Sequence, residues 1–319
     1  MSPHASRWLS GIAILCALAL AGTASAATQV LVIAGLGGEA QFDARFTKWS
    51  EQVAKASATT TGDVARVQRL AGESARREDI QSALRSAAER LREGDQFLLV
   101  LLGHGSFDGS EYRFNIAGPD ITGSEMLALL DRIPAGVLQL VVNATSTSGA
   151  IAERWVKPNR VVITATRTGG ERNAPRFGAF WAEALASEEA DRDKDGAVTA
   201  QEAFDYTTRK VNDAYKSDAA VVTEHAKLTG TEPTRFVVAR LGAGAMFAND
   251  TQLIAMRNEQ AGIERRLAQL QAQKKELPQD EYFNRIEPVL VELARLGARV
   301  DARLATLGAG AGGTTDAKP

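Results

Sequence analysis

The hydrophobic residues of the chain gather into four continuous apolar runs, and amphipathic stretches separate them. The runs are "TQVLVIAG" (28–35), "DQFLLVLLGHG" (95–105), "VLQLVVNA" (137–144) and "RVVITATRTG" (160–169). Runs rich in β-branched and aliphatic residues are typical of strands that are buried on both faces. The alternating segment "DVARVQRL" (63–70) predicts a further strand nearer the edge of the sheet.

Helical patterns fill the intervals between these strands, at 39–57, 77–94 and 121–133. Strands that alternate with helices predict an α/β fold, with a mostly parallel sheet and helices on both faces. We expect this sheet domain to span residues 27–241. In such sheets ligands bind at the carboxyl ends of the strands, so the residues that follow each buried strand are the candidates for chemistry.

The pattern changes beyond the sheet domain. Residues 242–250 are rich in glycine and alanine and predict a linker. From 251 to 307 apolar residues recur at spacings of three and four on both sides of "ELPQD" (276–280), which predicts an antiparallel helical hairpin. Pro288 should kink the second helix or mark a false start. The hairpin would either pack on the sheet domain or serve as an arm for dimerisation or partner binding, and the tail at 308–319 is expected to be disordered.

Charge and cysteine content narrow the function classes. The formal net charge is −2, so no overall charge draws the chain to nucleic acid. The first 26 residues combine Arg7, an apolar core and a small-residue end at 24–26, which predicts a signal peptide that is cleaved on export. We therefore expect a periplasmic or secreted protein without a membrane span, and a retained N-terminal anchor is the alternative. Cys16 is the only cysteine and lies in this leader, so the mature chain would hold no thiol.

The strongest local motif is "DRDKDGAVTAQE" at 191–202, which has the residue pattern of an EF-hand calcium loop. Its expected oxygen ligands are Asp191, Asp193, Asp195, the Ala197 carbonyl, Thr199 and Glu202. Gly196 stands where the loop must turn sharply, and we expect flanking helices at 177–190 and 200–215. Because the ligands are all oxygens and the loop has no second copy, we expect a structural Ca²⁺ site with a dissociation constant on the order of 10⁻⁴ M. The alternative is a solvated acidic turn.

Two other features give weaker signals. "AGLGGEA" (34–40) follows the first strand and fits a phosphate-binding turn through Gly35, Gly37 and Ala40. No acidic residue ends the second strand, so we favour a tight turn that packs helix on sheet over nucleotide binding. We expect His225 to be structural or at the surface, since two distant histidines make a poor zinc site.

Polar residues follow two consecutive buried strands: His104 and Gly105 after one, and "NATSTSG" (143–149) after the next. From about residue 28 to 241 this layout resembles the caspase-like superfamily, which includes legumains and metacaspases. In that family a His-Gly follows one strand, and Asp/Asn-Ala-Cys-x-Ser-Gly follows the next. The resemblance implies that His104 matches the general base and Gly105 the oxyanion donor, while Thr145 stands in the place of the cysteine nucleophile. "TSTSG" is also one residue longer than the family pattern.

Loss of the thiol changes the expected chemistry. A thiol ionises near pH 8.5, whereas a hydroxyl needs a base that a third group aligns. Asp108 and Glu111 are candidates for that third group only by their nearness in sequence. The favoured hypothesis is an exported, calcium-binding pseudoenzyme that acts by binding an unidentified protein or peptide. The alternative is a hydrolase with His104 as base and a hydroxyl nucleophile from Thr145, Ser146 or Ser148.

Overall fold

The computed structural model describes residues 27–247 and 250–312, so the expected signal peptide lies outside the described residues. Six strands form the central sheet in the order β10-β8-β7-β3-β1-β2. Their bounds are β1 Thr28–Ala34, β2 Val67–Ala71, β3 Gln96–Gly103, β7 Leu138–Thr145, β8 Arg160–Thr164 and β10 Lys227–Thr229. All neighbours pair in parallel except β10, which runs antiparallel to β8 at the edge. The mostly parallel α/β fold that the sequence predicts is confirmed.

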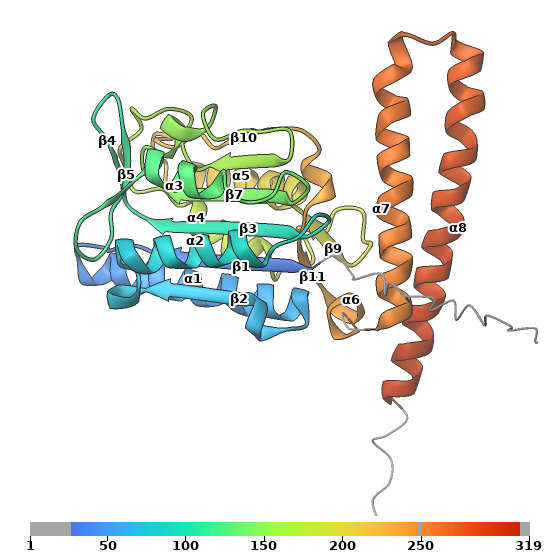
Figure 1. Cartoon of the computed structure of the whole chain (residues 1–319), viewed down its shortest axis with the longest axis horizontal. Helices are drawn as coiled ribbons and strands as arrows, with labels where there is room; N and C mark the ends of the chain where they lie inside the picture. The colour runs from blue at the N-terminus through green and yellow to red at the C-terminus, as the bar shows by residue number, and fades with distance from the viewer. Residues whose placement is uncertain (1–26, 248–249, 313–319) are drawn as a thin grey trace, which may run out of the picture.

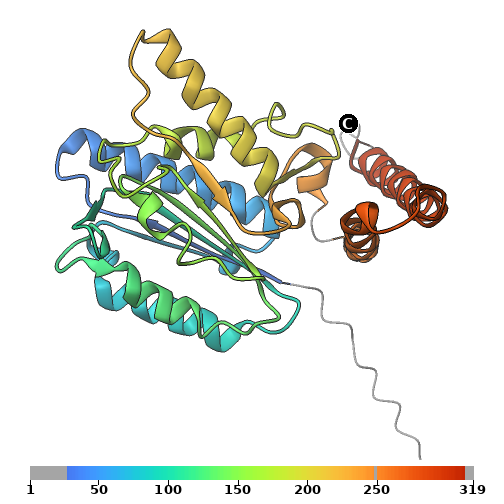
Figure 2. The same ribbon diagram turned by 90° about the horizontal axis from the view of Figure 1, so that it is seen from above.

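Helices cover both faces of the sheet (Figures 1 and 2). One face packs against α2 (Arg77–Arg90) and α3 (Gly123–Leu130), and the other against α1 (Ala40–Thr61), α4 (Phe177–Ala184) and α5 (Ala200–Ser217). Strand residues alternate between the two cores. On β3, the even-numbered side chains from Leu98 to Leu102 lie in the α1 core, and the odd-numbered ones from Phe97 to Leu101 lie in the α2 core. Full burial of each such side chain is worth about 1.5–3 kcal/mol.

Two small sheets complete the domain. β4 (Gly105–Phe107), β5 (Tyr112–Phe114) and β6 (Ile121–Thr122) form an antiparallel sheet beyond the carboxyl end of β3. β9 (Ala197–Thr199) pairs antiparallel with β11 (Val237–Arg240). Next to this pair, the Leu241 N–H donates to the Gly196 carbonyl at 2.9 Å. These strands are too short to show an apolar run or a clear alternation, so the sequence does not predict them.

The helical hairpin consists of α7 (Thr251–Ala272) and α8 (Gln279–Gly312), which stand beside the sheet domain in Figure 1. Asp250 caps α7 by accepting the Leu253 N–H at 2.8 Å, and it pairs with Arg303 of α8 at 2.7 Å. These contacts close the base of the hairpin. α8 includes Pro288 in its interior, so the proline does not mark a false start.

The structure corrects several expected boundaries. α4 ends at Ala184 rather than 190, because the Ser187 hydroxyl accepts the Glu189 N–H at 3.3 Å and so offers the backbone a turn in place of the helix. The expected linker contains a short helix, α6 (Gly242–Met246). Residues 308–312, expected to be disordered, continue α8. Residues 313–319 lie outside the described residues.

Smaller shifts affect the first strands and helices. α1 extends four residues beyond the expected end at 57, and a 3-10 turn (Val64–Arg66) takes the first part of the expected strand at 63–70.

Within residues 27–247 and 250–312, no helix is both long and apolar enough to cross a membrane.

Candidate functional site

Pairing of β3 with β7 brings the ends of these strands together at one edge of the sheet. Gly103 lies opposite Thr145 in this pairing. The His104-Gly105 pair and the Thr145-Ser146 pair therefore follow neighbouring strands. Whether they can work together depends on the direction in which each side chain projects.

The His104 side chain projects toward α1. Its Nε2 atom lies 3.2 Å from the Gly37 carbonyl oxygen. Its ring meets the rings of Phe42 and Phe46 edge-on, with centroids 4.9 and 5.1 Å away. Edge-to-face contacts of this kind fix the orientation of a ring. Among the described residues, no hydrogen bond joins His104 to a hydroxyl group.

The Thr145 side chain projects to the opposite face. Its hydroxyl donates to Asn143 Oδ1 at 2.7 Å and lies 2.8 Å from the hydroxyl of Tyr112, a member of the α2 core. Thr145 is fully buried. Burial raises the pKa of Tyr112 to about 12, against the lowering effect of Thr145 and Asn143, so the phenol stays protonated at neutral pH. The Thr145 hydroxyl is part of a buried polar network, and none of its hydrogen-bond partners among the described residues is a base.

The Ser146 hydroxyl and the Gly105 backbone form two reciprocal hydrogen bonds. The Ser146 hydroxyl accepts the Gly105 N–H at 3.1 Å and donates to the Gly105 carbonyl at 3.0 Å. A Cβ atom at Gly105 would lie 2.6 Å from the Ser146 carbonyl oxygen, so only glycine fits this position. The N–H that the family resemblance assigns to an oxyanion hole is thus already bonded within the protein.

The remaining hydroxyls of the loop also lie inside the fold. Ser148 accepts the Thr166 N–H at 3.1 Å and lies 3.2 Å from the Thr166 hydroxyl. Thr147 adopts a left-handed backbone conformation (φ 57°), and its buried hydroxyl has no hydrogen-bond partner among the described residues. The cluster joins β7 to the segment after β8 rather than opening onto a cleft.

Neither proposed orienting carboxylate reaches His104. Asp108 accepts from Arg113 at 2.6 Å, and this bond, with the N–H groups of Glu111 and Ser110, holds the Asp108 pKa far below its usual value. Glu111 accepts from the Ser124 hydroxyl and N–H. Both residues organise the turn and helix that follow β4.

The glycine turn after β1 already binds a carboxylate of the protein itself. The Gly37 N–H donates to Asp43 Oδ1 at 2.7 Å, so a carboxylate of α1 occupies the position that a phosphate would take. A Cβ atom at Gly37 would lie 2.3 Å from the Asp43 nitrogen. This geometry fits the packing turn that we favoured. His225 lies at the domain surface, where its Nδ1 is 3.1 Å from Glu171.

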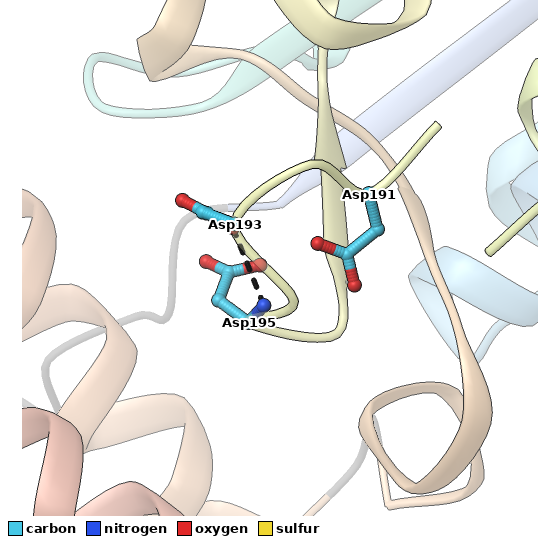
Figure 3. A group of neighbouring side chains, drawn as sticks. All are labelled: Asp191, Asp193 and Asp195. Carbon is cyan, nitrogen blue, oxygen red and sulfur yellow. Dashed lines mark hydrogen bonds between the residues drawn. The ribbon is translucent and has the colours of Figure 1, made fainter. Parts of the chain in front are cut away.

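The acidic loop brings three aspartates together (Figure 3). One carboxylate oxygen from each of Asp191, Asp193 and Asp195 lies within 4.8 Å of the others. Gly196 takes a positive φ of 81° and its N–H donates to Asp191 Oδ2 at 3.0 Å, which makes the sharp turn. Asp191 is 5% exposed, and its Oδ1 is buried without a partner among the described residues. A cation would satisfy this orphaned acceptor, so the donor set fits a metal ion.

The electrostatics of the loop also favour a cation. Burial raises the pKa of Asp195 to about 6, against the lowering effect of the Ala197 N–H, and the charges of Asp193, Asp191 and Glu202 raise it further. Burial likewise raises the pKa of Asp193. Carboxylates that repel each other in this way become fully charged more easily when a cation lies between them.

The other expected ligands also make contacts within the protein. Thr199 is the N-cap of α5, and its hydroxyl and N–H donate to Glu202 Oε2 at 2.8 and 2.9 Å. Glu202 Oε1 accepts the Arg192 N–H at 3.0 Å, which ties the carboxylate to the start of the loop. Ala197 begins β9, which pairs with β11 instead of with a second calcium loop.

Charges of α7 act on the loop, a relationship that sequence inspection missed. Burial lowers the pKa of Arg257, and the charge of Asp195 opposes this effect. Burial raises the pKa of Glu264, and the charge of Asp193 raises it further. More than sixty residues separate these partners in the chain, so no local pattern could have indicated them.

No protein-family profile matches the chain, and no curated protein sequence matches it. Among solved structures, it is similar to caspase-1 from Spodoptera frugiperda, with a TM-score of 0.47 and 12% identity over 68% of this chain and 91% of the other. It is also similar to protein GSU0716 from Geobacter sulfurreducens, with a TM-score of 0.46 and 14% identity over 68% of this chain and all of the other. At these scores the similarity is one of outline and says nothing of the chemistry.

Proposed function

We propose that the protein is an exported, calcium-stabilised binding protein on a caspase-like sheet, without a working nucleophile. The observation that carries this proposal is the opposite projection of His104 and Thr145. A base must come within hydrogen-bonding distance of the hydroxyl that it activates, directly or through one water. The bonds between Ser146 and Gly105 further support it, because they occupy both the second hydroxyl and the oxyanion donor.

A hydrolysis assay tests this proposal. We expect a peptide library to show no turnover by the wild type with Ca²⁺ present, and none by Thr145→Cys, whose thiol would face the α2 core. Turnover by the wild type that His104→Ala abolishes would contradict the proposal and favour the hydroxyl hydrolase. Turnover only by Thr145→Cys would show instead a working base that lacks its nucleophile.

Calcium is the ion we propose for the acidic loop, since the ligands are carboxylate and carbonyl oxygens and the loop is large enough for six or more of them. The site would stabilise the fold, because an ion that binds only the folded state adds about 2.7 kcal/mol at a hundred times its dissociation constant. The pairing of β9 with β11 would place this stabilisation at the junction between the sheet domain and the hairpin.

Thermal unfolding with added Ca²⁺ or Mg²⁺ tests the ion. We expect Ca²⁺ to raise the melting temperature, Mg²⁺ to do so less, and Asp191→Asn to abolish the Ca²⁺ effect. Asp205→Asn is the matched control, since Asp205 lies exposed on α5 outside the loop and bonds only Gln201. An equal response of the two variants to Ca²⁺ would contradict the site.

The binding partner in this proposal is a protein or peptide, and the location is the periplasm or the exterior. The leader pattern of the first 26 residues supports the location, and a single calcium loop of the low affinity proposed here would suit the high calcium outside the cell. Sequencing the N-terminus of the secreted protein tests it, and we expect the mature chain to begin near Ala27.

A further inference from the structure

One face of α8 is apolar and exposed. Seven large hydrophobic side chains are exposed among the described residues, and three of them lie on α8: Phe283 (52% exposed), Leu290 (46%) and Val291 (42%). At 3.6 residues per turn these three share one side of the helix with Ala294 and Ala298, which are also exposed. We call this set of five residues the α8 stripe. Exposed apolar patches of this kind mark interaction surfaces.

The hairpin does not need the α8 stripe for its own stability. Val289 and Leu296 lie on the inward side of α8 and pack with Ile263 of α7. The stripe projects away from α7, so the inward side of α8 and the stripe are separate surfaces. A partner could therefore cover the stripe without opening the hairpin.

Two unpaired charges lie at the stripe: Glu287 falls within its arc, one turn from Phe283 and Val291, and Arg295 borders it. Arg285, Arg299 and Arg303 of α8 each form an ion pair within the hairpin region. Arg295 and Glu287 are exposed and form no ion pair with any described residue. Unlike most charges of the helix, these two remain free to pair across an interface.

We propose that α8 binds α8 of a second copy of this chain in antiparallel orientation, about a twofold axis between Leu290 and Val291. In this register Leu290 lies level with Val291 of the second copy, so the two large residues at the centre meet each other across the axis. Phe283 lies level with Ala298 of the second copy, so a large side chain faces a small one. A twofold interface must be self-complementary in this way.

The same register pairs the two free charges. Glu287 and Arg295 of the second copy then differ in height by about 1.5 Å, one residue of helical rise. A shallow hollow of about 430 Å³ next to Val291 has Arg295 in its wall, together with Glu259 and Glu292, whose carboxylates already pair with Arg299 and Arg266. Because the axis is twofold, the ion pair forms twice. This charge complementarity favours a second copy of the chain over an unrelated partner.

The dimer should be weak. The stripe holds only three large apolar residues, and stable interfaces bury about 800 Å² on each partner. Asp280 and Asp301 also become level across the axis, and like charges at both ends oppose association. We therefore expect a reversible dimer that forms at micromolar or higher concentration.

Sedimentation velocity of the whole protein over roughly 1–200 µM tests the proposal. We expect a concentration-dependent dimer for the wild type and a monomer for Leu290→Lys. Val221→Lys is the matched control, because Val221 is also exposed (83%) but lies outside α8, and it should dimerise like the wild type. Circular dichroism checks that each variant keeps its helices.

A charge swap tests the antiparallel register. Glu287→Lys and Arg295→Glu should each weaken the dimer at least fivefold, because each places like charges together. An equimolar mixture of the two variants should dimerise again, since one ion pair re-forms with reversed polarity and the other with its original polarity. A wild type that is monomeric throughout, or a mixture that dimerises no better than either variant alone, would overturn the proposal. These outcomes are independent of calcium binding and of peptide hydrolysis.

Discussion

His104 directly follows β3 and Thr145 ends the neighbouring parallel strand β7, yet their side chains lie on opposite faces of the sheet. His104 packs against Phe42 and Phe46 of α1, whereas Thr145 bonds Tyr112 in the α2 core. The sheet itself therefore separates the two groups that a hydrolytic mechanism would have to join. This separation leads to a first prediction about reactivity.

A thiol placed at Thr145 should be unreactive. In a Cys16→Ser background, we expect Thr145→Cys to react with iodoacetamide at least a hundredfold more slowly than Ser110→Cys, which lies in an exposed turn. Burial disfavours the thiolate, and His104 is not beside it to stabilise the charge. The measurement is the alkylation rate at pH 7.5. Fast alkylation that His104→Ala slows would contradict the geometry.

Ser146→Ala should destabilise the fold by about 1–3 kcal/mol, because it removes the hydroxyl that bonds both the half-buried N–H and the carbonyl of Gly105. Urea unfolding measures the change. Thr147→Gly is the contrasting variant at the next position. It removes an unpaired hydroxyl and relaxes a left-handed backbone, so its stability should be unchanged or higher. Equal losses in both variants would argue against the Ser146–Gly105 contact.

The Arg160–Asp131 pair should govern part of the acid stability. The Arg160 guanidinium is fully buried and donates to Asp131 at 3.0 Å. Burial alone would raise the pKa of Asp131, but Lys157 and Arg160 outweigh it and lower the pKa below its ordinary value. The contribution of the pair is therefore present above pH 4 and is lost as the pH falls through the lowered pKa.

Asp131→Asn should cost about 2–3 kcal/mol at pH 7, since it leaves a buried guanidinium uncompensated. The loss relative to wild type should shrink as the pH falls toward 3. Lys157→Met removes only the exposed partner of Asp131 and should cost under about 1 kcal/mol. Urea midpoints at pH 7, 5 and 3.5 provide the comparison, and a difference that grows on acidification would contradict the sign.

The charges of α7 should tune cation affinity at the acidic loop. Glu264→Gln removes a negative charge that acts on Asp193, and we expect it to weaken Ca²⁺ binding roughly two- to fivefold. Arg257→Gln removes a positive charge that acts on Asp195, and we expect it to strengthen binding by a similar factor. Isothermal titration at low and high salt measures both. Changes in the same direction in the two variants would rule out the electrostatic account.

Four strands of the central sheet could be predicted from their apolar runs and β2 from its alternation, whereas the three residues of β10 carry no pattern. The directions in which the side chains project at the strand ends could not be predicted from the sequence. It depends on the register of β3 against β7, and a slip of one residue would have moved Thr145 to the face that holds His104. Tertiary packing sets this register, so the composition of "NATSTSG" alone suggested nucleophiles where the structure has buried structural hydroxyls.

The acidic loop shows the opposite balance. Its spacing predicted that Asp191, Asp193 and Asp195 would converge, because the ligands are local in sequence and one glycine sets the turn. The spacing could not show that Glu202 caps α5 or that α7 faces the loop. A local motif predicts the geometry of its own residues well, but it does not indicate which residues from distant parts of the chain will contact them.

The pairing of β9 with β11 also has a consequence for the order of folding. Among the described residues, β9 (197–199) pairs only with β11 at 237–240. The Arg240 N–H in turn donates to the Thr60 hydroxyl at 3.1 Å. As the chain is synthesised from its N-terminus, β9 cannot pair with β11 until residue 240 is available. Contacts so distant in sequence form late. Binding of the proposed Ca²⁺ would therefore stabilise the last contacts to form, in a sheet domain that is otherwise already assembled.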